Sequence, residues 1–271
     1  MNEQRFVVSD VLWQRLEPHL PGKVSDAGAS AKDNRLFLEA VFWRVRTGSP
    51  WRDLPPTLGN WNSQFRRFRR WAKSGVFESL FNAMSRDPDL EYALIDGTIV
   101  QVHQKATGAK GGLRLKPSAA RQCMFTCTRG GRSRGGLTTK IVALVDALGN
   151  LVRFLLLPGQ AHDMKGVAPL IRGVSFDALL ADKAFDADWL LQDLDERGAT
   201  AVIPPKANRK IQRNFDTEVY KWRHLVENYF AKIKEFRGIA TRYDKTDCSY
   251  TASWNGDIWW RTTSQRSKSS E

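Results

Sequence analysis

The sequence predicts an α/β fold, in which helices cover a central mixed sheet on both sides and a small all-helical, helix-turn-helix-like region precedes it. Two observations support this fold class. Apolar residues recur at helical spacing from about residue 8 to 85, and after Pro88 apolar and β-branched runs typical of strands alternate with helical segments. We therefore expect a helical domain at 1–87, an α/β domain at 88–250 and a divergent, disordered tail at 251–271.

Composition narrows the class of protein and its partners. The chain has 271 residues, 42% of them hydrophobic, which is enough to bury a substantial core. Its formal net charge of +13 favours a polyanionic partner, with nucleic acid ahead of a membrane surface. No apolar run approaches the roughly 20 residues that span a bilayer, and the N-terminus lacks a signal-peptide pattern, so we expect a cytoplasmic protein without a membrane partner.

The first 85 residues contain several helices separated by residues that break helices. Ser9 is suited to cap the first helix, which ends at Pro21 and Gly22. A second helix is expected over 34–46, and a short helical segment over 51–58. The three cysteines of the chain are too few and too irregularly spaced for a disulfide framework or a zinc site, so we expect free thiols.

A basic helix is predicted over 61–73. Its aromatic residues recur at helical spacing, while the other side is polar and carries five cations without an acid. A short helix, a glycine-containing turn and a basic helix succeed one another as in helix-turn-helix DNA binders. The candidate DNA contacts are Arg66, Arg67, Arg69 and Arg70. The alternative is a solvated basic helix in a bundle.

After Pro88 the pattern changes from helices to alternating strands and helices. A first strand is expected over 90–103, and two strands joined by a turn at 148–150 form a hairpin over 136–159. The remaining elements are a helix after Asp163, a strand at 178–185, a helix at 187–197, a strand at 199–205 and a helix at 216–236. Residues 112–131 are basic and show no period, so we expect an atypical loop there.

Two aspartates stand within apolar strands. Asp96 lies in ALIDGT and Asp182 in LLADKAF. A carboxylate among apolar strand residues costs several kcal/mol unless a cation, a hydrogen-bond donor or a metal ion compensates its charge. For Asp182 the alternative partner is Lys183, although adjacent strand residues point to opposite faces.

Residues 220–234 predict one amphipathic helix. At about 100° per residue, its apolar face comprises Trp222, Leu225, Val226, Tyr229, Phe230 and Ile233. A separate stripe holds Tyr220, Arg223, Glu227 and Lys234. This stripe is either a solvated flank or a site that sets one carboxylate among cations.

Together, Asp96, Asp182 and Glu227 would form a set of three carboxylates if the helix packs beside the sheet. Three carboxylates in a dry site cannot all stay ionised without compensation, and hard divalent cations provide it. Such a set suits phosphoryl transfer by two metal ions, and magnesium fits these oxygen ligands.

The spacing Tyr220-x2-Arg223-x3-Glu227-x6-Lys234 matches the signature of bacterial insertion-sequence transposases of the Asp-Asp-Glu (DDE) class. The sequence resembles the insertion-sequence-five group over about residues 8 to 250, with further similarity in TGSPWRDLP, GRSRGGLTTK, PGQAHD, AVIPPKANRK and IATRYDKT. The resemblance implies a ribonuclease-H-like catalytic domain. In it, Asp96, Asp182 and Glu227 would hold two magnesium ions, with manganese as a substitute.

The same resemblance implies an enzyme that hydrolyses one strand at the transposon end and joins the freed 3′-hydroxyl to target DNA. Tyr220, Arg223 and Lys234 would contact DNA near the scissile phosphate. The expected partner is double-stranded DNA, comprising terminal inverted repeats and target, bound by a homo-oligomer associated with the bacterial nucleoid. No P-loop is present, so we expect no nucleotide cofactor.

Other candidate residues have competing interpretations. Arg132 and Arg134 in GRSRGG are either phosphate contacts or part of a solvated loop, and His162 is either structural or part of the site. The sequence departs from the family in the longer segment before GRSRGG and in lacking an apolar helix after about Ala252. Because of these departures, the first alternative to an active transposase is a catalytically inactive remnant that only binds DNA. The second alternative is a stand-alone nuclease with the same metal site.

Overall fold

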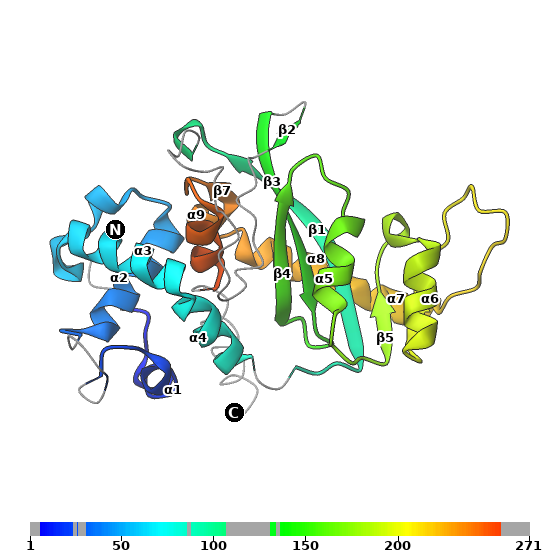
Figure 1. Ribbon diagram of the computed structural model, residues 1–271, viewed down its shortest axis with the longest axis horizontal. Helices are drawn as coiled ribbons and strands as arrows, with labels where there is room; N and C mark the ends of the chain where they lie inside the picture. The colour runs from blue at the N-terminus through cyan, green and yellow to red at the C-terminus, as the bar shows by residue number, and fades with distance from the viewer. Residues whose placement is uncertain are drawn as a thin grey trace. The chain divides into compact units, whose positions relative to one another are not determined.

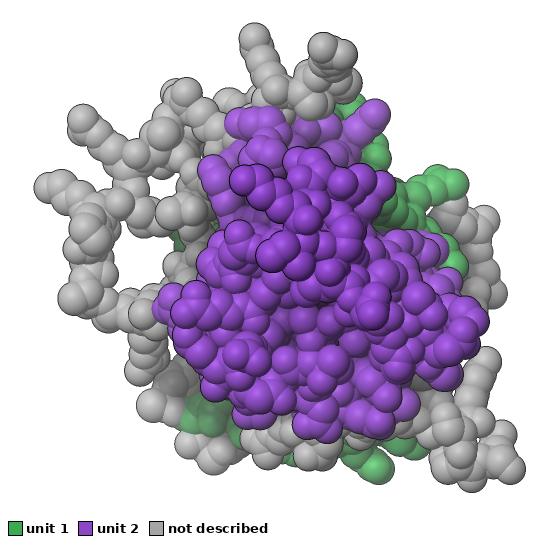
Figure 2. Space-filling view, turned by 90° about the vertical axis from the view of Figure 1, so that its right-hand side faces the viewer, with its two compact units in different colours: residues 1–86, 102–127, 233–271 green, residues 87–101, 128–232 purple. Residues whose placement is uncertain are grey.

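The structure, a computed structural model, describes residues 6–23, 26, 31–85, 88–106, 131–133 and 136–255. Its contacts divide the chain into two compact units, which Figure 2 colours separately. We call them the helical unit, residues 1–86, 102–127 and 233–271, and the sheet unit, residues 87–101 and 128–232. Within the described ranges, no helix has the length and apolar character that crossing a membrane requires.

The N-terminal part of the helical unit is all-helical, as predicted. Its elements are α1 (Asp10–Leu16), η1 (Glu17–His19), α2 (Asn34–Thr47), η2 (Trp51–Asp53), η3 (Pro56–Leu58), α3 (Trp61–Ser74) and α4 (Val76–Met84). The Ser9 hydroxyl caps α1 by accepting a hydrogen bond from the Leu12 amide. Gly48 ends α2 with φ 69° and Gly75 ends α3 with φ 74°, a left-handed conformation that favours glycine.

The end of the chain also belongs to the helical unit. It contributes α9 (Arg237–Ala240), β7 (Thr241–Arg242) and a helix over 247–255. Tyr250 and Trp254 are fully buried, and the guanidinium of Arg44 in α2 donates to Asp244 (2.9 Å) and to Ser253 (3.0 Å). The prediction of a disordered tail from residue 251 is therefore wrong for 251–255.

The error arose because Tyr250 and Trp254, an i, i+4 pair that forms one apolar stripe of the helix, lie on opposite sides of the predicted boundary. Residues 256–271 lie outside the described ranges, as do 112–130 of the predicted atypical loop. The predicted boundary at residue 250 differs from the division by contacts, which places 233–271 with the N-terminal helices.

The sheet unit contains a mixed sheet with flanking helices, as predicted. Its strands are β1 (Tyr92–Val102), β2 (Gly131–Ser133), β3 (Gly136–Val145), β4 (Leu151–Pro158), β5 (Ala178–Leu180) and β6 (Thr200–Val202). They follow the order β2-β3-β1-β5-β6, with β4 also paired to β3. The pairs β1–β3, β2–β3 and β3–β4 are antiparallel, whereas β1–β5 and β5–β6 are parallel.

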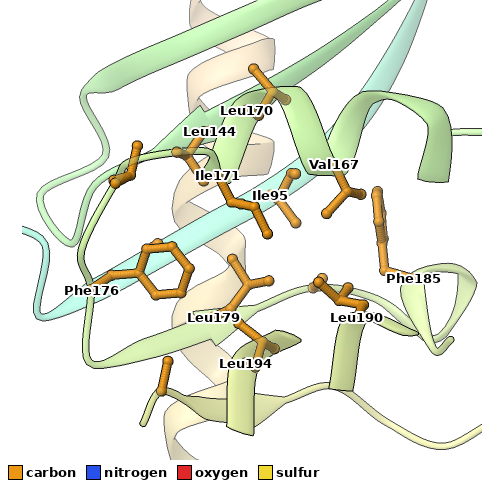
Figure 3. Packing of buried hydrophobic residues seen from close by; sticks show 14 of the residues in the cluster. Ile95, Leu144, Val167, Leu170, Ile171, Phe176, Leu179, Phe185, Leu190 and Leu194 are labelled. Atoms are coloured by element: carbon orange, nitrogen blue, oxygen red, sulfur yellow. The ribbon is translucent and has the colours of Figure 1, made fainter. Parts of the chain in front are cut away.

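Helices cover both sides of this sheet. The helical elements are α5 (Met164–Ile171), η5 (Lys183–Phe185), α6 (Asp188–Glu196), α7 (Thr217–Tyr220), η6 (Lys221–Arg223) and α8 (His224–Ile233). In Figure 1, α5 lies in front of the strands and α8 behind them. The core between the sheet, α5 and α6 is apolar, with Ile95, Leu144, Val167, Leu179 and Leu190 among its buried members (Figure 3).

Candidate active site

Asp96 and Asp182 lie at equivalent positions of two neighbouring strands. The strands β1 and β5 are parallel, with Leu94 paired to Leu180, and each aspartate comes two residues after that pair. Neighbouring strands lie about 4.8 Å apart, so the two aspartates lie side by side at the C-terminal end of β5. The sequence prediction that both carboxylates emerge together at the sheet agrees with this register.

Backbone amides orient both carboxylates. Asp96 Oδ1 accepts a hydrogen bond from the Gly97 amide (2.7 Å), and Asp182 Oδ1 accepts one from the Ala184 amide (2.7 Å) at the start of η5. Each aspartate therefore has one oxygen fixed by its own turn of backbone. Their remaining oxygens are available for another partner, which for Asp96 is a guanidinium.

Arg223 joins the third carboxylate to the first. Its Nη1 donates to Asp96 Oδ2 (3.1 Å), and its Nη2 donates to Glu227 Oε1 one helical turn later. The side chains of Asp96 and Arg223 are each 19% exposed, and that of Glu227 is 53% exposed. The structure thus brings Asp96 and Glu227, which are distant in sequence, to one cation.

The pKa directions describe one electrostatic cluster. Burial raises the pKa of Asp96, and the carboxylates of Asp182 and Glu227 raise it further, against the lowering effects of the Gly97 amide and Arg223. Burial alone would lower the pKa of Arg223, but the charges of Asp96 and Glu227 raise it overall. Asp182 and Tyr220 act on Arg223 in the same direction. Among these residues the carboxylates therefore outnumber the single guanidinium, so added positive charge would favour their ionised forms.

The donor set fits a hard divalent ion by its chemistry, since all three acidic groups supply carboxylate oxygens. In the ranges that the structure describes, no three His, Cys, Asp or Glu side chains are grouped around one metal position. The guanidinium of Arg223 contacts Asp96 and Glu227 instead. Holding an ion jointly would require Arg223 to leave these two carboxylates.

The signature residues around Glu227 do not share one continuous helix. The predicted helix over 216–236 is divided into α7, η6 and α8, and Trp222 in η6 is 53% exposed, so its predicted place on the buried face is wrong. Tyr220 ends α7, and its ring centroid lies 5.9 Å from the Arg223 guanidinium carbon. Lys234 follows the last residue of α8, and burial lowers the pKa of its ammonium group.

The predicted DNA-contacting arginines of α3 separate into two groups. A surface hollow of about 660 Å³ is lined by Asn62, Phe65, Arg66, Arg69, Arg70, Lys73 and Ser74. Arg67 is instead directed towards α2, where Nη1 donates to the Asp33 carbonyl (3.0 Å) and the guanidinium carbon lies 4.5 Å from the Phe37 ring centroid. Burial, followed by the charge of Arg70, lowers the pKa of Arg67. Arg67 therefore supports the fold.

The structure adds residues that the sequence did not indicate. Asp163 binds Lys140 (2.6 Å) and packs over Gly97, where a Cβ atom would lie only 3.0 Å from the Asp163 carboxyl carbon. Gly97 directly follows Asp96, so this contact fixes the strand beside the site. A glycine inside an apolar strand was the available signal, because it often marks a close approach.

Three other candidates can be placed only in part. His162, next to Asp163, is exposed. Arg132 lies in β2, and Arg134 lies outside the described residues.

Comparisons with known proteins agree with this architecture. Residues 8–81 match a family model described as "Putative transposase of IS4/5 family", and residues 88–251 match one described as "Transposase DDE domain". The "Putative transposase for insertion sequence element IS6501" of Brucella ovis is 37% identical over 112 residues, which cover 41% of this chain and 86% of that protein. The uncharacterized protein y4sN of Sinorhizobium fredii is 42% identical over 106 residues, which cover 38% of this chain and 85% of that protein.

Solved transposase structures show weaker similarity. A piggyBac transposase synaptic complex with hairpin DNA has a TM-score of 0.37 at 15% identity, covering 76% of this chain and about half, 49%, of that chain. A Mos1 transposase paired-end complex has a TM-score of 0.24 at 14% identity, covering 89% and 82%. The assignment rests on the family models, of which the second covers more than half of the chain. The chain belongs to the IS4/5 family of insertion-sequence transposases and carries their DDE domain.

Proposed function

We propose that this DNA transposase cleaves transposon ends and joins the 3′-hydroxyl to target DNA at the site formed by Asp96, Asp182 and Glu227. The observation that supports this most is the position of Arg223. Its guanidinium contacts Asp96 and Glu227, and the charge of Asp182 also raises its pKa. Carboxylates from β1 and α8 thereby share one cation, and Asp182 follows the neighbouring strand β5.

Asp96, Asp182 and Glu227 would hold two magnesium ions, for which manganese can substitute. When bound, such ions activate the attacking oxygen and stabilise the leaving oxygen in phosphoryl transfer. The Gly97 and Ala184 amides bind one oxygen of each aspartate, so the other oxygen of each would be the one that holds an ion.

Arg223 would then exchange its carboxylate partners for a phosphate of the bound strand. Its fork of donors suits phosphate as well as carboxylate, and Tyr220 supports the guanidinium from one side. Lys234 would add a further cation near the same strand. In this proposal Arg223 holds the acidic residues together until DNA binds.

The basic hollow on α3 would recognise transposon ends. Arg66, Arg69, Arg70 and Lys73 surround it, with Asn62 near the N-terminal end of the helix. Cations fix a protein on the phosphate backbone, and an amide is suited to base edges. We further propose a homo-oligomer on the DNA, acting in the cytoplasm on nucleoid DNA.

A cleavage assay tests the proposal. The substrate is a duplex that carries the terminal inverted repeat of the element encoding this chain, with magnesium present. Asp96→Asn, Asp182→Asn and Glu227→Gln should each abolish cleavage while end binding stays nearly intact. The exposed Glu218 provides a matched control, since Glu218→Gln should cleave like the unmodified chain.

Each other outcome has a distinct meaning. Undiminished nicking by any one carboxamide variant of the three acids would refute the site. Tight binding by the unmodified chain without any nicking would show a protein that only binds DNA. Hydrolysis without strand joining would show a nuclease.

A further inference from the structure

A basic loop between β6 and α7 has no role in the function proposed above. We call residues 206–213 the anchored loop. Its cations are Lys206, Arg209, Lys210 and Arg213, and it contains no acidic residue. It belongs to the sheet unit, which also holds the three acidic residues.

Asp186 fixes this loop to the fold. Its side chain is fully buried, and it accepts hydrogen bonds from the Lys206 amide (2.8 Å), from Arg213 Nη1 (3.0 Å) and from Arg209. The Asp186 carbonyl accepts a further bond from Lys206 Nζ (2.9 Å). One buried aspartate thus binds three of the four cationic residues of the loop.

The loop is also closed on itself, which leaves its tip exposed. Gln212 Nε2 donates to the carbonyls of Lys206 and Arg209, both at 3.2 Å. Lys210 is exposed, and Ile211 is 81% exposed. A rigid segment therefore presents one cation and one apolar side chain to solvent, and little entropy would be lost when the tip binds a partner.

Both ends of the loop are connected to the acidic site. Asp186 comes four residues after Asp182, so their Cα atoms are at most about 14 Å apart. After the loop, the Phe215 ring packs against Tyr220 with centroids 5.5 Å apart, and Tyr220 in turn lies beside Arg223. One turn of B-DNA is about 34 Å long, so a single duplex at the acidic residues can also reach the loop.

We propose that the anchored loop is a second DNA-contacting element, in which Lys210 binds a phosphate and Ile211 enters a groove against the bases. The net positive charge selects a polyanion, and apolar side chains flanked by cations are used by proteins that wedge open base steps. This inference rests on the proposed function, because that function makes DNA the partner.

Fluorescence anisotropy on the full chain tests this element. The probe is a fluorescein-labelled duplex of arbitrary sequence, about 30 base pairs or three turns long, with 2-aminopurine at a central TA step. Lys210→Ala should lower the slope of log affinity against log salt by about 0.9. Ile211→Ala should weaken binding about tenfold without changing this slope, and should reduce the 2-aminopurine signal of unstacking.

Two exposed residues of the sheet unit give matched controls. Leu148, 61% exposed at the β3–β4 turn, is the control for Ile211, and Lys165 on α5 is the control for Lys210. Leu148→Ala and Lys165→Ala should both bind like the unmodified chain.

Two results would overturn the proposal. The first is that both loop variants bind DNA like their controls. The second is that Ile211→Ala alters the oligomeric state in sedimentation without altering DNA affinity, which would assign Ile211 to a contact with a second copy of the chain. Cleavage is not the readout, so either result is distinguishable from a failure of the acidic site.

Discussion

At the residue scale, Arg223 is the cation that links two carboxylates of the proposed site. It contacts Asp96 and Glu227 in a setting where two of the three side chains are mostly buried. Removing one partner from a largely buried ion pair leaves a carboxylate whose desolvation is no longer compensated. The stability of the metal-free chain should therefore depend on this arginine.

We expect Arg223→Gln to lower the free energy of unfolding of the metal-free chain by about 2 kcal/mol. Magnesium should restore more stability to this variant than it adds to the unmodified chain, because its carboxylates lack their cation. Chemical unfolding with and without magnesium measures both effects. Arg172→Gln, at an exposed arginine after α5, is the control, and equal behaviour of the two variants would contradict the assigned role.

The buried Asp186 makes a pH-dependent contribution. Burial opposes its charged form, but hydrogen bonds from Arg209, the Lys206 amide and Arg213 lower its pKa from 3.8 to about 2. A carboxyl group with a lowered pKa in the folded state stabilises the fold above its unfolded pKa. That contribution is lost as the pH falls from about 3.8 towards 2.

Asp186→Asn should therefore cost about 2 kcal/mol at pH 7, and the difference from the unmodified chain should narrow between pH 4 and 2. Urea unfolding across this range measures it. Asp188 offers a matched control, because it binds the same Arg209 with a side chain that is 89% exposed. A cost for Asp188→Asn as large as that for Asp186→Asn would argue against the buried anchor.

At the scale of elements, α3 has two different faces. Arg66, Arg69 and Arg70 line the surface hollow, whereas Arg67 is held by α2 through the Asp33 carbonyl. Helical spacing correctly predicted α3 itself. The direction of each arginine depended on its packing partners, which composition does not reveal.

Replacing Arg66, Arg69 and Arg70 by glutamine should weaken duplex binding and reduce its salt dependence by about 0.9 for each phosphate that the protein no longer neutralises. Arg67→Gln should instead lower thermal stability and leave the salt slope unchanged. Anisotropy in a salt series, together with thermal unfolding, separates the two effects. A flatter slope for Arg67→Gln without any loss of stability would contradict its structural role.

The C-terminal helix over 247–255 stabilises the helical unit rather than forming a tail. Trp254 is fully buried, so Trp254→Ala should destabilise the chain by about 3–5 kcal/mol. Trp222→Ala, at a half-exposed tryptophan, should cost far less. Thermal unfolding compares the two, and equal costs would contradict the burial of this helix.

At the scale of the whole molecule, the fold class and the two candidate aspartates were predictable for different reasons. An aspartate in an apolar strand is costly enough to mark a candidate site, and the fold class follows from the alternation of strands and helices. Asp163 and Asp186 were not found, because Asp163 lies in the turn before α5 and the partners of Asp186 lie in the anchored loop, and the sequence pattern specifies the path of neither segment. The break within the predicted helix over 216–236 was missed because neither glycine nor proline marks it.

Manganese binding, measured by electron paramagnetic resonance on the chain bound to a transposon-end duplex, tests whether Asp96, Asp182 and Glu227 hold metal ions together. We expect two ions per chain, with binding weakened by Asp96→Asn, Asp182→Asn and Glu227→Gln and unaffected by Glu218→Gln. Undiminished binding in all three carboxamide variants would show that these acids do not hold the ions together.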